Sequence, residues 1–490
     1  MASQSAIAEG GSIVSSDQIS YQQKLYSHPS YVFDPLYPNT FGQAINLSTN
    51  SQVPVVIQIP TDVFNFSQSM LQYTVNLPAG PAGTYTWYSL QALREISHIQ
   101  IYGSNGQFLL DIDNLQNYLD ITLKKELSQD EFLSLDPMTG VSQSNSVTNS
   151  IPALRNTNVL GVNTPNLPAN PSSVNYMEPA YFQVGGNGTF AAPTNPGTIN
   201  APTTYNVQFP LRLIKNSLLS IDKDLYFGAT IYMRLYFGPM TKVAFSSTVN
   251  DSPSNGVKTS FVGLANAVST VSNLQLMIAR ETNLDLIAMV KNKVMMEGLS
   301  YKIPYVQAFK NPNQGANQTI SIQLDAGNGK SLVKVYHAPY NALEDLDTMY
   351  DHANTANVAG ANQGSSAVNQ KVFTYYTLLN SKRVQDINLD CTNNGPYTDY
   401  MSHRRQLRSS ILSNLNVYQY NWFHCDDFSD FGPQYDHSGD STLISGIPLG
   451  IASLTWVFNG LTTRNIPLQH YTWFVFIKQL KIIPGQVTVD

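Results

Sequence analysis

Residues 93–119 read LREISHIQIYGSNGQFLLDIDNLQNYL, and this stretch decides the fold class. Apolar and polar residues alternate on both sides of Asn105-Gly106, a dipeptide that supplies the positive φ angles of a tight hairpin turn. After the hairpin, Leu115 and Leu119 fall at helical spacing. The stretch therefore predicts two antiparallel strands, followed by a helix near Asn114–Lys125.

The same layout occurs twice in the chain. A second hairpin is predicted from Lys371–Leu379 and Arg383–Leu389, with a helix near Asp399–Leu412. A long polar loop belongs to each copy, as do two further alternating strands, predicted at Tyr205–Leu213 and Tyr226–Phe237 in the first copy and at Leu449–Phe458 and Tyr471–Ile482 in the second. Such duplication predicts an all-β chain of two antiparallel barrels, and it favours an architectural role over a chemical one.

Length and composition agree with a large assembly unit. A chain of 490 residues exceeds the size at which one hydrophobic core stops growing, so two domains are expected. Charged residues make up 12%, about half the usual share, while 28 tyrosines are present. Such a neutral, aromatic-rich surface favours packing against other protein copies, although a secreted β protein can share this composition. A net charge of −6 gives no footprint for tight nucleic-acid binding.

The first residues carry neither the positive region nor the apolar region of a signal peptide, so synthesis in the cytoplasm is expected. Apolar runs are far shorter than the ~20 residues of a spanning helix. With only Cys391 and Cys425, a disulfide framework is excluded, and reduced buried thiols are favoured.

The chain divides into an N-terminal arm and two halves. The arm covers residues 1–30, the first barrel 31–270 and the second barrel 271–490. Loops rich in Pro, Asn, Gly and Ser, about 136–204 and 343–370, interrupt the two barrels and should project from the same end of each. A helix is predicted over Asn283–Val294, with Thr282 as its cap.

One cluster resembles a metal site. His424, Asp426, Asp427 and His437 offer imidazole and carboxylate ligands for zinc or calcium. Their spacing fits no closed zinc motif, however, and the stretch follows a predicted strand, so a polar loop is favoured. We therefore expect neither a metal nor a cofactor, with these residues as weak metal candidates.

Enzyme motifs are missing from the sequence. It has no Gly-x-Ser-x-Gly elbow, no His-Glu-x-x-His and no Walker loop, so no catalytic residues are expected. Arg404, Arg405 and Arg408 lie on one side of the predicted helix near Asp399–Leu412. They could form a solvated helix face, or contact a membrane, DNA or a neighbouring carboxylate.

Three passages carry a family resemblance: residues 93–119, residues 210–238 (PLRLIKNSLLSIDKDLYFGATIYMRLYFG), and residues 372–389 (VFTYYTLLNSKRVQDINL) with 399–423 (DYMSHRRQLRSSILSNLNVYQYNWF). In these passages and in its duplicated layout, the chain resembles the double jelly-roll major capsid proteins of icosahedral double-stranded DNA viruses. That lineage includes tectivirus-like phages, adenoviruses, virophages and polinton-like viruses. The resemblance covers nearly all of the chain beyond residue 50.

This resemblance implies two tandem eight-stranded jelly rolls that stand perpendicular to a virion shell. Three copies would form a pseudo-hexagonal homotrimer that tiles the facets, with the two long loops as towers on the outer surface. The implied partners are other copies, penton and minor cement proteins, and an inner membrane where the virus has one. In such a shell, Arg404, Arg405 and Arg408 would make an inner-shell contact. An alternative is a carbohydrate-binding or receptor-binding β-sandwich protein, such as a fibre or adhesin, with a shallow aromatic site. A jelly-roll glycoside hydrolase would need paired carboxylates on facing strands, and the assigned inner positions carry almost none.

Overall fold

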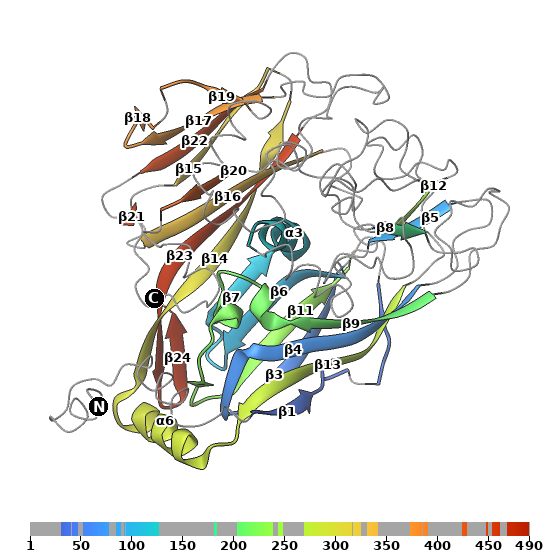
Figure 1. The fold of residues 1–490 in the computed structure, drawn as a ribbon, viewed down its shortest axis with the longest axis vertical. Coiled ribbons are helices and arrows are strands. Elements are labelled where there is room, and N and C mark those ends of the chain that lie inside the picture. Colours follow the sequence, from blue (N-terminus) through green and yellow to red (C-terminus); the bar gives the residue numbers. More distant parts are fainter. Residues whose placement is uncertain are drawn as a thin grey trace, which may run out of the picture.

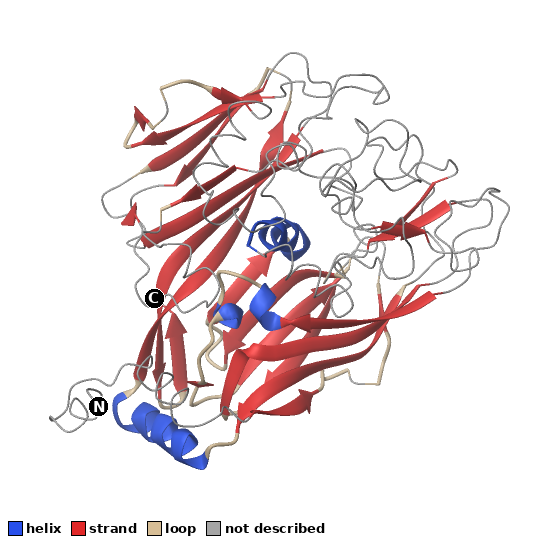
Figure 2. Ribbon diagram, viewed as in Figure 1, coloured by secondary structure: helices blue, strands red, loops and turns tan. Residues whose placement is uncertain are grey.

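The computed structural model shows two antiparallel β-sandwiches in tandem, with few helices (Figures 1 and 2). It describes residues 31–40, 42–47, 52–77, 85–89, 93, 95–126, 181–183, 203–238, 244–247, 269–315, 317–324, 331–341, 373–384, 386–390, 424–428, 447–448, 453–460 and 468–489. The predicted arm, residues 1–30, and the predicted loop 343–370 lie outside these residues.

The first sandwich has two main sheets. One runs in the order β1-β13-β4-β10, with β2 paired to β13 and β9 paired to β4; the other runs β3-β11-β6-β7. This is the alternating strand order of a jelly roll. The bounds are β1 Tyr31–Leu36, β2 Ile45–Asn46, β3 Val53–Ile59, β4 Val63–Leu77, β6 Ile96–Gly103, β7 Phe108–Asp113, β9 Thr203–Pro210, β10 Leu225–Tyr226, β11 Ile231–Phe237 and β13 Thr270–Glu281.

Strand β11 shows why this sandwich forms. Its residues alternate strictly between buried and half-buried, with Ile231, Met233 and Leu235 in the interior. Met233 lies opposite Ile57 of β3 and Ile101 of β6, which are also fully buried. Because side chains alternate across a strand, the period of two in the sequence places every second side chain in one core.

A small third sheet joins β12 (Ala244–Ser247), β5 (Tyr85–Ser89) and β8 (Tyr181–Gln183). Strand β8 lies within the region predicted as a long loop, residues 136–204, whose remaining residues are outside the described part except for the start of β9. This segment of the loop is therefore a strand that pairs antiparallel with β5.

The second sandwich repeats the order of the first. One sheet runs β14-β23-β16-β20, with β21 paired to β16 and β24 paired to β23; the other runs β15-β22-β17-β18, with β19 paired to β17. The bounds are β14 Leu299–Gln314, β15 Thr319–Leu324, β16 Ser331–Asn341, β17 Phe373–Leu379, β18 Lys382–Arg383, β19 Leu389–Asp390, β20 His424–Asp427, β21 Ile447–Pro448, β22 Leu454–Gly460, β23 Leu468–Ile483 and β24 Gln486–Val489.

Helix α3 (Leu115–Glu126) lies between the two sandwiches (Figure 1). Residues 115–119 are all buried, so the helix packs on every side through this turn. Helix α6 (Leu284–Glu297) joins the sandwiches at one end of the molecule and begins at Asn283, whose side-chain oxygen accepts from the amides of Asp285 and Leu286. The prediction of Thr282 as the cap is therefore wrong by one residue.

Several strand predictions need correction. Residues Leu211–Leu213 form the 3-10 helix η3, followed by a second, η4 (Leu218–Ser220), so the strand ends at Pro210. The strand expected from Tyr226 is split into β10 and β11. Between β18 and β19 the described residues are exposed and are not a continuous strand.

The division at residue 270 stays a prediction. Strand β13, which begins there, pairs with β1 and β4 of the first sandwich along its length. The next strand, β14, pairs with β23 of the second sandwich. Helix α6 therefore connects the last strand of one sandwich to the first strand of the other.

Candidate interaction surfaces

The interior of the second sandwich holds part of the predicted metal cluster. His424 is buried, and its Nε2 lies 3.0 Å from Asp426 Oδ2. The indole Nε1 of Trp456 donates to the same carboxylate oxygen at 2.5 Å. Burial favours a higher pKa for Asp426, but the charge and hydrogen bond of His424 and the bond from Trp456 outweigh it and hold that pKa well below its usual range.

A third side chain of this interior, His337, comes from the neighbouring strand β16. The register places His337 opposite His424, and their rings stack with centroids 5.7 Å apart. Its Nδ1 lies 2.8 Å from Thr472 Oγ1, while its Nε2 is buried without a hydrogen-bond partner among the described residues. Burial is the main cause that lowers the pKa of His337 well below its ordinary value.

The strand assignment corrects the expected polar loop, because residues 424–427 form β20 and pair with β16. Asp427 lies on that strand, but its side chain and His437 are outside the described residues, as are Arg404, Arg405 and Arg408. Within the described part, no group of three or more His, Cys, Asp or Glu side chains is placed to hold a metal ion. Cys425 is buried in β20, whereas Cys391 lies outside the described residues. The expectation that no metal is bound and the inner-shell contact of the arginines therefore stay predictions.

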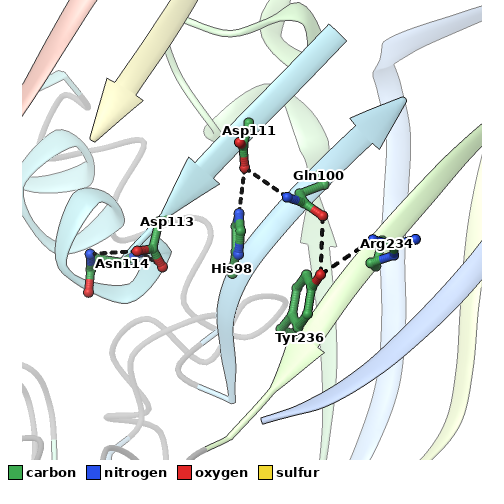
Figure 3. A network of polar contacts seen from close by, with 7 residues as sticks. All are labelled: His98, Gln100, Asp111, Asp113, Asn114, Arg234 and Tyr236. Carbon is green, nitrogen blue, oxygen red and sulfur yellow. Dashed lines mark hydrogen bonds and ion pairs between the residues drawn. The ribbon is translucent and has the colours of Figure 1, made fainter. Parts of the chain in front are cut away.

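A second polar network lies on the first sandwich, on the outer face of β6, β7 and β11 (Figure 3). His98 Nε2 lies 2.5 Å from Asp111 Oδ1, and the Gln100 amide donates to the same oxygen at 3.1 Å. Tyr236 donates to Gln100 Oε1 at 3.3 Å and accepts from Arg234 at 3.4 Å. These side chains meet because Gln100 lies opposite both Arg234 and Asp111 in the sheet register.

Aromatic rings fix this network in place. The His98 ring stacks on Tyr236 at a centroid distance of 4.9 Å, and the Arg234 guanidinium lies 4.8 Å from the centre of the Tyr102 ring. Hydrogen bonds to Tyr236 and Tyr102 raise the pKa of Arg234. The face is therefore preorganised, with a cation and several phenol rings held in defined positions.

The edge of this face meets the second sandwich. Strand β7 lies beside β14, and the Asp111 carboxylate of β7 adds to burial in raising the pKa of Tyr305 on β14 to about 12. At the hairpin tip, Asn105 and Gln107 donate to the backbone oxygens of Val487 and Val489 in β24 at 3.0 and 2.7 Å. Two edge strands, β7 and β14, thus form one side of the contact between the sandwiches.

Helix α3 forms the other side of this contact. Tyr118 is fully buried, with its ring centroid 6.3 Å from Tyr336 and 6.0 Å from Trp473, both of the second sandwich. Its hydroxyl donates to the backbone oxygen of Lys215, and Asn216 donates to the Tyr336 hydroxyl at 3.2 Å. This apolar and hydrogen-bonded contact couples the two sandwiches.

A third polar cluster lies at the base of the first sandwich. Tyr31 of β1 donates to Asp224 Oδ1 at 2.9 Å, and Asn65 donates to Tyr31 and to Asp222. Burial raises the pKa of Asp224 to about 7. The sequence gives no signal for this cluster, because Tyr31, Asn65 and the pair Asp222 and Asp224 are 34 to 193 residues apart along the chain.

In the part of the chain that the structure describes, no helix has both the length and the apolar character needed to cross a membrane.

Solved structures are similar to this chain, whereas no family model and no curated protein sequence matches it. The VP54 protein of PBCV-1, whose crystal structure was fitted into a reconstruction of the virophage Sputnik, is 10% identical over 95% of this chain and 97% of that chain, with a TM-score of 0.54. The Faustovirus major capsid protein is 11% identical over 93% and 91%, with a TM-score of 0.53. A chain of the Sputnik virophage is 11% identical over 94% and 88%, with a TM-score of 0.51. The chain therefore has the double jelly-roll fold of these capsid structures.

Proposed function

We propose that this chain, with the fold that PBCV-1 VP54 and the Faustovirus major capsid protein share, is itself a major capsid protein. The observation that carries the proposal is the completeness of the likeness: both sandwiches and their connection are matched over more than nine-tenths of each of these chains. A protein that used one sandwich to bind a ligand would not need this whole arrangement.

The role is structural, and its mechanism is self-assembly. Three copies associate into a homotrimer with a pseudo-hexagonal outline, and these trimers tile the facets of an icosahedral virion. The rigid contact between the sandwiches supports this, because α3 is buried on both sides and makes one copy a single building block. Low charge supports extensive contacts between copies. Further partners are penton and minor cement proteins, with an inner membrane where one exists.

Light scattering on the purified chain, combined with negative-stain images of the same peak, tests the proposal. A mass near three times 54.1 kDa with hexagonal particles is the expected result. A monomer without such particles at high protein concentration would contradict the capsid role. Binding of that monomer to a glycan array would then favour the adhesin alternative.

A further inference from the structure

Helix α6, which connects the two sandwiches, carries apolar side chains on both of its sides. The inner side is buried against the sandwiches through Leu286, Val290 and Val294. The outer side exposes four large apolar side chains: Leu284 (79%), Met289 (39%), Met295 (59%) and Met296 (85%). Ala288 and Asn292, also exposed, lie between them at helical spacing. The solvent side of a surface helix is normally polar, so this outer side is unusual.

The exposed apolar surface continues beyond the end of the helix. Ile483 of β23 is 45% exposed, and a Cβ on Gly298, which caps α6, would lie 3.2 Å from its Cγ2. We call this set the α6 face: Leu284, Met289, Met295, Met296 and Ile483. Exposed apolar surfaces of this kind mark contact sites, and methionine side chains adapt easily to a partner.

The charged residues of α6 do not interrupt the middle of this face. Asp285 and Glu297 lie in the first and last turns of the helix. Lys291 is half-buried and pairs with Asp62 at 3.3 Å, and Lys293 is half-buried and pairs with Glu297. The α6 face therefore suits an apolar partner of low charge.

The chain that precedes β1 leaves the first sandwich beside this face. The first residue of β1, Tyr31, lies opposite Glu281, the last residue of β13 and three residues before Leu284 (Figure 1). Because the two strands are antiparallel, the chain before Tyr31 points in the direction in which β13 continues into α6. The hydroxyl of Tyr31 donates to Asp224 at 2.9 Å, which holds this exit point in place.

The sequence of residues 1–30 has the length and the chemistry to cover the α6 face. Helix α6 has 14 residues and is about 21 Å long, so about seven extended residues can pass along it. Apolar and aromatic residues gather in the second half of the arm: Ile13, Val14, Ile19, Tyr21, Leu25 and Tyr26. Its acidic and basic residues are only Glu9, Asp17 and Lys24.

We propose that residues 1–30 of each copy pack on the α6 face of the same copy, through the apolar side chains of residues 13–26. This inference goes beyond the proposed capsomer, because it concerns a single copy and holds for a monomer and a trimer alike. The packed arm covers the apolar surface at the connection between the sandwiches and shields it from lipids and other chains.

Lys24 supplies a reporter for the arm, because it is the only lysine or arginine in residues 1–30. Trypsin cleaves the accessible chain after Lys24, and mass spectrometry of the full-length protein follows the loss of the first 24 residues. When opening is fast relative to cleavage, the cleavage rate measures the population of released arm. The double variant Met295→Gln with Met296→Gln removes two apolar side chains, adds no trypsin site and keeps helix propensity. It should be cleaved after Lys24 about ten-fold faster or more.

Val384→Gln is the matched control. Val384 is as exposed as Met295, at 59%, but it follows β18 in the second sandwich, so this variant should be cleaved at the unaltered rate. Cleavage after other lysines and arginines is followed in the same spectra. If the double variant is cleaved faster everywhere, it is unfolded, and Leu284→Gln at the other end of α6 then repeats the test.

Equal cleavage rates after Lys24 in the unaltered chain and in the folded variant would overturn the proposal, as would an unaltered chain cleaved as fast as a synthetic peptide of residues 1–30. A rate in the unaltered chain that falls as trimers form would assign the arm to a neighbouring copy. Flotation of the unaltered chain with phosphatidylcholine vesicles, lost in the variant, would assign the α6 face to a lipid surface. Either result overturns packing within one copy. The capsomer is tested separately by light scattering, so the two proposals can fail independently.

Discussion

Replacing His337 with phenylalanine should change how the stability of the second sandwich depends on pH. His337 is fully buried between Trp456, Phe458 and Phe474, and phenylalanine can retain these ring contacts. The variant therefore keeps an aromatic ring at this position but removes the titrating imidazole and its hydrogen bond with Thr472. Thr472 keeps a partner in the variant, because Asn311 also donates to its hydroxyl at 2.9 Å.

The sign and size of this change in stability with pH follow from the number of protons that the folded and unfolded chains bind. The pKa of His337 is lowered in the folded chain, by burial first and then by the charge of His424, and the charge of His470 acts in the same direction, while Asp426 opposes them. Below the ordinary histidine pKa of about 6.5, the unfolded chain therefore binds a proton that the folded chain does not. For as long as the folded chain keeps the ring neutral, each further pH unit should cost about 1.4 kcal/mol of stability.

Urea denaturation followed by tryptophan fluorescence measures this effect, since the Trp456 ring lies 4.9 Å from His337. Relative to His337→Phe, the unaltered chain should lose stability as the pH falls below about 6.5, by up to about 1.4 kcal/mol per pH unit. Thr472→Val is the control, because it removes the hydrogen bond but keeps the imidazole, and it should retain the pH dependence. Parallel stability curves for the unaltered chain and His337→Phe would refute the reasoning.

Three further outcomes are expected. Asp224→Asn should gain about 3 kcal/mol of unfolding free energy relative to the unaltered chain between about pH 5 and pH 8, because burial raises the pKa of Asp224 to about 7 in the folded chain. Between the ordinary aspartate pKa of about 4 and about pH 7, the unfolded chain has lost a proton that the folded chain keeps, so rising pH destabilises the folded state; equal gains at both pH values in urea titrations would contradict this. Gly298→Ala should cost about 2 kcal/mol in urea denaturation, since Gly298 has φ +75° and an added Cβ would lie 3.0 Å from the Ile482 oxygen, whereas Gly42→Ala, at φ +83° in open space, should cost less. Tyr118→Ala should cost about 3 to 5 kcal/mol and split the calorimetric transition in two as the sandwiches uncouple; a single unshifted transition would show that α3 does not couple them.

Elements with strong local signals could be predicted from the sequence. Asn105-Gly106 forms the expected turn, with Gly106 at φ +80°, and β6 and β7 flank it as predicted. Helix α3 lies within one residue of its predicted bounds, Asn114–Lys125. Regular alternation and turn chemistry are local properties, so the fold class follows from them.

Elements that depend on distant partners could not be predicted. Residues 424–427 read His-Cys-Asp-Asp, a polar sequence typical of a loop, yet they form a strand because β16 pairs with them and Trp456 satisfies the Asp426 carboxylate. The contact between β7 and β14 is equally invisible in the sequence, since nothing local specifies which edges meet. The structure does not test the full set of metal candidates or the predicted role of the arginines, because His437, Arg404, Arg405 and Arg408 lie outside the described residues.

The hydrogen bonds from the β6–β7 hairpin to β24 impose an order on folding during translation. Asn105 is synthesised 382 residues before Val487, its partner. The first sandwich can close once β13 has emerged from the ribosome, because all strands of its two main sheets precede residue 282. Locking of the hairpin tip must wait until β24 is made. While the second sandwich is being synthesised, the first sandwich of a nascent chain therefore lacks its hydrogen bonds to β24. The two sandwiches can form one rigid unit only when translation is nearly complete.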